Sequence, residues 1–121
     1  MADIKTSVQK CLETDGCLGA ALVDYESGLA LGIAGRPGFD LELAAAGNAE
    51  VVRAKKKIRD KLGLPDKIED ILITLNTQYH LIRMVGTTMF LYVALDRQKA
   101  NLALARKDLE IIDKNLEIAR S

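Results

Sequence analysis

The 121-residue chain has few of the residues on which catalytic and metal sites depend. It has one histidine, His80, and two cysteines, and no phosphate-binding G-x-x-x-x-G-K-[ST] or G-x-G-x-x-G sequence. A multi-histidine metal site is therefore excluded, and any serine or cysteine triad would have to use that single imidazole ring. We expect a protein that is not an enzyme, with no metal and no cofactor.

Long apolar runs and a net charge are also absent. The longest apolar runs, 17–23 and 89–95, have seven residues each, whereas a transmembrane helix needs about 20. The opening sequence MADIKTSVQK lacks the apolar centre of a signal peptide. Seventeen basic residues balance 17 acidic ones, which argues against a nucleic-acid partner. We expect a cytoplasmic protein without direct membrane insertion.

The overall composition is that of a globular protein, with 49% apolar and 28% charged residues. The length fits one domain over residues 1–121. Two cysteines in a chain without an apparent leader do not make a disulfide framework. Buried, inert thiols are the favoured interpretation of Cys11 and Cys17, and a redox switch is the alternative.

The spacing of apolar residues predicts three helices and five strands. The expected helices are 3–14, capped by Asp3 or Thr6, then 40–62, and 97–119, capped by Asp96. The expected strands are 17–24, 29–35, 68–75, 79–85 and 88–95. This order, αββαβββα, predicts an α+β fold in which a five-stranded antiparallel sheet carries helices on both faces. Small residues in the first two strands would let a helix pack very close to the sheet.

The helix at 40–62 is unusually long for so small a protein. At 1.5 Å per residue it measures about 33 Å, whereas the expected radius of gyration is only about 14 Å. We therefore expect it to protrude or to pack on another molecule. Ala44, Gly47 and Val51 would allow a second helix to approach closely, and Asn48 would set the register between the two helices. In the alternative, the small residues pack on the chain's own sheet.

The strand at 68–75 also indicates self-association. In the predicted order it forms an edge of the sheet, yet its centre is Ile71-Leu72-Ile73. An apolar edge without protection invites pairing with another chain. A symmetric dimer in which two such edges pair would resolve this exposure.

A basic run follows the small residues in the same helix, with Lys55, Lys56, Lys57, Arg59 and Lys61. The favoured interpretation is a solvated helix end, where positive charge interacts well with the helix dipole. A patch for phosphate or for an acidic partner is the alternative. His80 lies in a predicted strand without an evident carboxylate or cysteine partner, which favours a packed or interfacial histidine over a base or a metal ligand.

The opening hairpin resembles that of the Roadblock family, which includes dynein-light-chain-like proteins and bacterial regulators of small GTPases. The resemblance is carried by Gly16–Asp24 (GCLGAALVD) and Glu26–Leu31 (ESGLAL). It extends through the Ala-rich helix, Leu43 to Ala54, and the three-strand meander to about Asp113, and so covers most of the chain.

The resemblance implies a profilin-like or longin-like fold and a homodimer joined through the third strand and the second helix. The dimer residues expected on these elements are Ala44, Gly47, Asn48, Val51, Ile71, Leu72 and Ile73. It also implies a non-catalytic platform that binds a small Ras-like GTPase. The expected partner-facing residues on the second helix are Leu43, Glu50, Arg53 and Lys57.

Two other functions stay open at this point. One is a structural adaptor for a motor or signalling complex that is indifferent to bound nucleotide. The other is a small-molecule sensor, which the small residues of the hairpin disfavour because they indicate close packing in place of an open pocket.

Overall fold

The computed structural model describes residues 2–116, and its elements follow the order αββαβββα. The helices are α1 (Ile4–Cys11), α2 (Leu41–Lys61) and α3 (Leu102–Asn115). The strands are β1 (Cys17–Asp24), β2 (Ala30–Gly35), β3 (Asp70–Thr74), β4 (Gln78–Val85) and β5 (Met89–Asp96). The predicted fold class and element order are confirmed.

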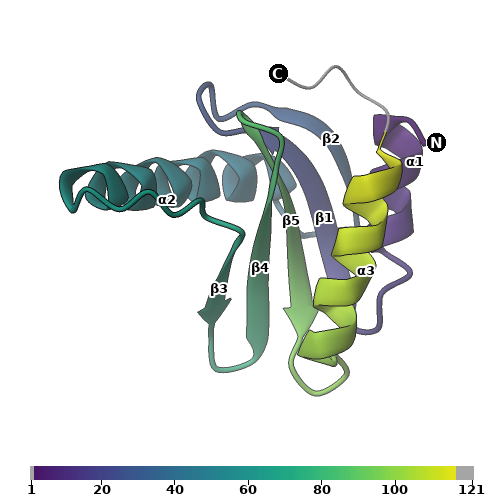
Figure 1. Ribbon diagram of the computed structural model, residues 1–121. Helices are drawn as coiled ribbons and strands as arrows, with labels where there is room; N and C mark the ends of the chain where they lie inside the picture. The colour runs from purple at the N-terminus through teal and green to yellow at the C-terminus, as the bar shows by residue number, and fades with distance from the viewer. Residues whose placement is uncertain (1, 117–121) are drawn as a thin grey trace.

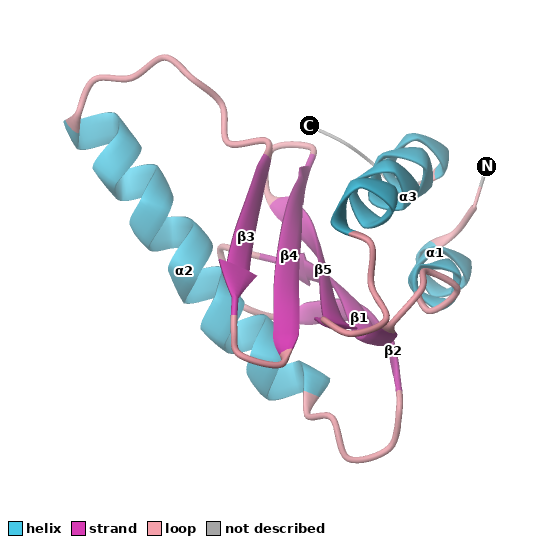
Figure 2. Cartoon of the chain, turned by 90° about the horizontal axis from the view of Figure 1, so that it is seen from below, coloured by secondary structure: helices cyan, strands magenta, loops and turns pink. Residues whose placement is uncertain are grey.

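The five strands form one antiparallel sheet in the spatial order β2-β1-β5-β4-β3. Helices α1 and α3 lie on one face of this sheet and α2 lies on the other, which gives three layers (Figures 1 and 2). Because β5 and β1 pair at the centre, β3 and β2 are the two edges. The prediction that the strand around Ile71–Ile73 forms an edge is confirmed.

Each face of the sheet has its own hydrophobic core. Between the sheet and the pair α1 and α3, buried Val8 and Leu109 pack with strand residues such as Leu22 and Leu91. Between the sheet and α2, the core is formed by Leu41, Ala45, Ala49, Val52, Phe90 and Tyr92, among others. Strands covered on both faces explain why 17–24 and 89–96 carry apolar residues at nearly every position.

The small residues of β1 and β2 permit the close helix packing that the sequence predicts. A Cβ atom at Gly19 would lie 3.0 Å from the Leu41 side chain, and one at Gly35 would lie 2.7 Å from it. On the opposite face, a Cβ atom at Gly32 would lie 2.6 Å from Ile4. The hairpin is therefore held between α1 and α2.

The last helix begins later than the sequence predicts. The residue that caps α3 is Asn101, whose side chain accepts from the backbone N–H of Leu104, so the expected cap at Asp96 is wrong. Asp96 instead accepts from the N–H of Gln98 and closes a turn, through which the chain passes close to Gly16 before the helix begins. Residues 117–119, predicted to continue this helix, lie outside the described residues.

Helix α2 extends past the sheet, as its length predicts. Its N-terminal half packs across β1 and β2, and its C-terminal half projects beyond the β3 edge (Figure 1). Beyond buried Val52, the large apolar residues at this end are uncovered in the single chain, with Ile58 48% and the C-cap residue Leu62 65% exposed. Within residues 2–116 no helix has both the length and the hydropathy needed to cross a membrane.

We predict that Gly16→Ala destabilises the fold far more than Gly38→Ala. Both glycines have positive φ, +81° and +88°, which costs about 1–2 kcal/mol for alanine. A Cβ atom at Gly16 would also lie 3.0 Å from the Ala100 backbone nitrogen, whereas nothing lies within 4 Å at Gly38. With an overpacking cost of about 1–3 kcal/mol added, Gly16→Ala should lower the free energy of unfolding by about 3 kcal/mol. Urea denaturation of both variants measures the difference, and equal losses would show that the backbone at Ala100 yields to the new methyl group.

Candidate interaction surface

An exposed apolar stripe runs along one side of α2. It consists of Gly47, Val51, Ile58 and the C-cap residue Leu62, which recur at the four- and seven-residue spacings of one helix side. Ala44 borders this stripe but is half-buried and packs against the core under α2, as the alternative interpretation of the small residues predicts. Val51 is 37% exposed, and Ile58 and Leu62 are more so. Large apolar side chains in such a row are unusual on the surface of an isolated domain and are typical of surfaces that contact another molecule.

Gly47 shows where this stripe can be approached most closely. A Cβ atom at Gly47 would meet nothing within 4 Å, so no group of the described chain requires a glycine there. Packing on the chain's own sheet accounts for buried Ala45 but not for Gly47, which costs about 1 kcal/mol in a helix interior. The position is thus open to close packing against another molecule, which stays a prediction.

Asn48 is turned toward the chain's own sheet. It is only 9% exposed, and its Nδ2 donates to the Ala44 carbonyl over 2.8 Å. It lies beside buried Tyr92, whose pKa burial raises to about 12, with Asn48 acting in the opposite direction. Little of the Asn48 side chain is exposed for contact with a second helix. Its position therefore gives small support to the expected role in setting the register between two helices.

The edge strand β3 carries a second set of apolar side chains, Ile71, Leu72 and Ile73, which are half-buried. Its neighbour on one side is β4, and no strand of residues 2–116 pairs with its other side. Ile71 packs against the core under α2, and Leu72 packs against the opposite core. Ile73 shares the face of Ile71 because strand side chains alternate. The stripe on α2 together with Ile71 and Ile73 is called the apolar surface below.

The four expected partner-facing residues do not share one environment. Leu43, Glu50 and Lys57 are exposed and spaced seven residues apart, so they lie along the outer side of α2. Leu43 is 70% exposed, and no hydrogen bond or ion pair within residues 2–116 holds Glu50 or Lys57. Arg53 is turned aside, because its Nη1 donates to the Tyr25 carbonyl. Arg53 thus holds α2 to the sheet in addition to any role in binding.

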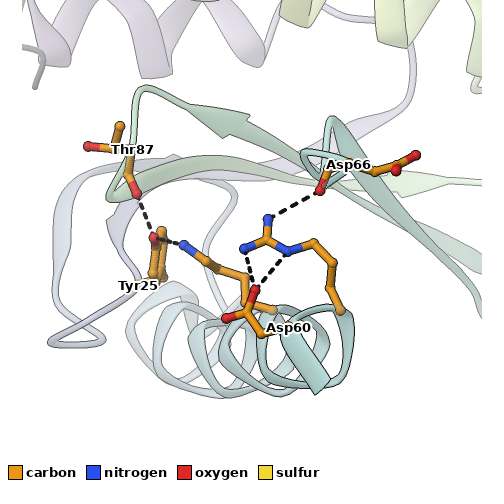
Figure 3. A network of polar contacts seen from close by, with 6 residues as sticks. Tyr25, Asp60, Asp66 and Thr87 are labelled. Atoms are coloured by element: carbon orange, nitrogen blue, oxygen red, sulfur yellow. Dashed lines mark hydrogen bonds and ion pairs between the residues drawn. The ribbon is translucent and has the colours of Figure 1, made fainter. Parts of the chain in front are cut away.

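A polar network fixes the projecting half of α2 to the turns of the sheet (Figure 3). The Tyr25 hydroxyl donates to the Thr87 carbonyl and accepts from Lys56, whose Nζ lies 4.6 Å from the centre of the tyrosine ring. Further along, Arg59 donates to Asp60 over 2.9 Å and to the Asp66 carbonyl over 3.4 Å. The network joins the helix to the β1–β2 turn, the β4–β5 turn and the segment before β3.

We predict that Tyr25→Phe loosens α2 without unfolding the protein. The ring would still fill its site, while the bonds to Thr87 and Lys56 would be lost at a net cost of about 1–2 kcal/mol. Hydrogen exchange should show faster exchange of amides in the second half of α2. Tyr79→Phe is the matched control, since Tyr79 is half-buried on β4, away from this network. Unchanged exchange in both variants would mean that the network does not hold the helix.

The remaining side chains that could react or bind a metal ion, those of the two cysteines and the histidine, are inert in this arrangement. Burial raises the pKa of Cys11 to about 12 and that of Cys17 to about 11, so both thiols stay protonated at neutral pH. His80 packs edge-on against Tyr92 with ring centres 5.5 Å apart, and burial lowers its pKa. No group of three or more His, Cys, Asp or Glu side chains in the described chain is placed to hold a metal ion.

Comparison with solved structures identifies the fold. MglB of Myxococcus xanthus superposes with a TM-score of 0.82 at 19% identity, over 92% of this chain and 89% of that one. A Roadblock/LC7 domain from Streptomyces avermitilis also gives 0.82, at 14% identity and 93% coverage of both chains. The fold is that of Roadblock/LC7 domains. An MglB described as having a tetrameric arrangement gives 0.76 at 16% identity, over 90% of this chain and 81% of that one.

The sequence comparisons add no relative. No family model matches the chain, and no curated protein matches it. The Roadblock resemblance seen in the hairpin is thus confirmed through the structure.

The network around Tyr25 is the part of this surface that sequence reasoning missed. Its only sequence signal is a tyrosine within a polar turn, which by itself indicates no partner.

Proposed function

We propose that this protein is a non-catalytic, homodimeric regulatory subunit that binds a small Ras-like GTPase and modulates its nucleotide state. The observation that carries the proposal is the apolar surface, which combines the exposed stripe of α2 with Ile71 and Ile73 on the edge strand β3 of a Roadblock fold. An exposed helix stripe beside an unpaired edge strand suits a second copy of the chain, and the Roadblock resemblance implies GTPase binding by such dimers.

The dimer follows from the geometry of β3 and α2. Two β3 edges can pair around a two-fold axis, so that both copies contribute the same residues and the sheet continues across the interface. Ile71 and Ile73 of each copy would then be covered, as would the α2 stripe with its open position at Gly47. The tetrameric arrangement described for one MglB structure supports self-association on this fold.

The proposed mechanism is differential affinity. A platform that binds one nucleotide state of a GTPase more tightly shifts the equilibrium between the two states by the ratio of its two affinities and no more. Leu43, Glu50 and Lys57, on the outer side of α2, stay accessible when the apolar stripe is covered. We therefore place the GTPase contact there, with Arg53 contributing mainly through its support of the helix.

Affinity capture from the native cytoplasm tests the proposal. The protein is used as bait in parallel with GDP and with a non-hydrolysable GTP analogue, and the recovered proteins are identified by mass spectrometry. We expect a Ras-like GTPase to be enriched in one nucleotide condition. Recovery of one large assembly equally in both conditions, without a GTPase, would replace the proposal with the adaptor function.

A further inference from the structure

A shallow basic hollow lies beside the projecting half of α2. It is lined by Arg53, Lys56, Lys57, Asp60 and Lys61 of the helix and by Tyr25 of the β1–β2 turn, and it has a volume of about 490 Å³. Four of these six residues are cations and one is an acid. In a chain with a formal net charge of zero, this is a marked local excess of positive charge. These six residues are called the basic hollow below.

Contacts within the described chain leave this charge largely uncompensated. The carboxylate of Asp60 is paired with Arg59, which lies outside the hollow, at 2.9 Å. Arg53 and Lys56 bind uncharged oxygens of Tyr25, so neither is neutralised. Lys57 and Lys61 are exposed and form no ion pair within residues 2–116. A ligand that brings negative charge therefore meets four cations, and the one acid of the hollow, Asp60, is paired with Arg59.

A helix end alone does not account for the cluster. The helix dipole favours cations only within the last turn, which in α2 holds Arg59 and Lys61. Arg53, Lys56 and Lys57 lie further back, where that effect has faded. On the sheet side of Lys56 lies a second hollow of about 220 Å³, lined by Lys56, Arg59 and Lys67 together with Ile68 and Met84. It extends the positive surface toward Gly86 and Thr87 of the β4–β5 turn.

The basic hollow and the apolar stripe occupy different sides of α2. Around a helix of 3.6 residues per turn, residues 53, 56 and 60 lie roughly 120–180° from residues 51, 58 and 62. Lys57 and Lys61 lie roughly 60–140° from those residues and form the rim of the hollow nearest the stripe. The hollow faces the β1–β2 turn, where Tyr25 lies (Figure 3). A second copy on the apolar surface would thus leave the hollow open, and a dimer would carry two of them.

We propose that the basic hollow docks an acidic segment of a partner protein, rich in Asp and Glu. Arg59 already donates to Asp60 through Nε and Nη2, and Arg53 donates Nη1 to the Tyr25 carbonyl, so only part of the guanidinium donor set that suits phosphate is left. The free cations are lysines around a wide and shallow hollow, which suits several spread carboxylates. The large exposed apolar residues Ile58 and Leu62 belong to the other side of α2, so no apolar face accompanies the hollow into a membrane.

Titration with a synthetic peptide of alternating Asp and Glu residues tests the proposal directly. In amide NMR spectra of the full chain, we expect shifts concentrated at residues 53–61 and around Tyr25. The double variant Lys57→Glu/Lys61→Glu should weaken binding about tenfold or more, because attraction becomes repulsion at two sites. Raising the ionic strength to about 1 M should also abolish binding, because the Debye length falls to about 3 Å.

The matched control is Lys10→Glu/Lys107→Glu, which makes the same charge change on the α1–α3 layer. We expect peptide binding within about twofold of wild type for this control, since its charges lie farther away than a Debye length of about 10 Å. Equal weakening by both double variants would overturn the proposal. Inorganic pyrophosphate and phosphatidylserine vesicles serve as further probes, and tighter binding of either than of the peptide would also overturn it.

The inference shares Arg53 and Lys57 with the proposed GTPase contact but needs no GTPase. If nucleotide-dependent capture fails while the acidic peptide binds at the hollow, only the proposed function falls. If a GTPase is captured while the peptide shows no binding, only the acidic docking site falls.

Discussion

Ile73→Lys should convert the dimer into monomers. Ile73 lies in the edge strand, one residue before its end, on the face of the sheet that carries the apolar surface. In the proposed dimer each copy would bury one unpaired lysine charge, at a cost of about 3 kcal/mol or more. Because a two-fold interface uses every residue twice, the total is about 6 kcal/mol, or roughly a 10,000-fold weaker dimer. Light scattering coupled to size-exclusion chromatography measures the change in mass.

Thr74→Lys is the control for this variant. Thr74 is exposed and its side chain points to the opposite face of β3, so a lysine there leaves the apolar surface intact. Circular dichroism should show both variants folded, because Ile73 is only half-buried in the single chain. A folded Ile73→Lys protein that keeps the dimer mass would contradict pairing through β3.

Leu43→Glu/Glu50→Lys should abolish capture of the GTPase while leaving the dimer and the melting temperature unchanged. Both residues lie on the outer side of α2, and Leu43 contributes the largest exposed apolar side chain there, at 70%. Loss of an apolar contact and reversal of a charge at a docked surface each cost about 2 kcal/mol, together more than a hundredfold in affinity. Capture in the favoured nucleotide condition, with quantitative recovery, measures this loss.

Glu13→Lys provides the matched charge reversal for that experiment. Glu13 is exposed after α1, on the opposite layer of the molecule, and its side chain forms a 3.9 Å ion pair with Lys10. We expect capture by this control to equal that of wild type. Undiminished capture by the Leu43→Glu/Glu50→Lys variant would move the GTPase contact to another part of the surface.

The layers of the fold could be predicted because local sequence patterns decide them. Continuous apolar runs at 17–23 and 89–95 indicate strands covered on both faces, and the small residues of the hairpin indicate close helix packing. The exposed half of α2 could be predicted from its length alone. The start of α3 could not, because an Asp before a helical pattern is a common cap, and here Asp96 closes a turn that carries the chain past Gly16.

The site was less accessible to sequence reasoning than the fold. The direction of Asn48 depends on how α2 is rotated against the sheet, and its neighbours Ala45, Ala49 and Val52 decide that rotation through burial. The bonds of Tyr25 to Lys56 and Thr87 join residues 31 and 62 positions apart, which no local pattern encodes. Arg53 is expected from the sequence to be free for a partner, but it donates to the Tyr25 carbonyl. This contact also joins residues far apart in the sequence, so no local pattern indicates it.

The affinity of the wild-type dimer for the recovered GTPase, in its GDP-bound and GTP-analogue-bound states, tests the central claim most directly. Isothermal titration calorimetry with purified proteins gives both dissociation constants. The account predicts that they differ about fivefold or more, the range of a functional coupling between sites. Equal affinities for the two states would contradict the account, because a partner without a preference cannot shift the switch.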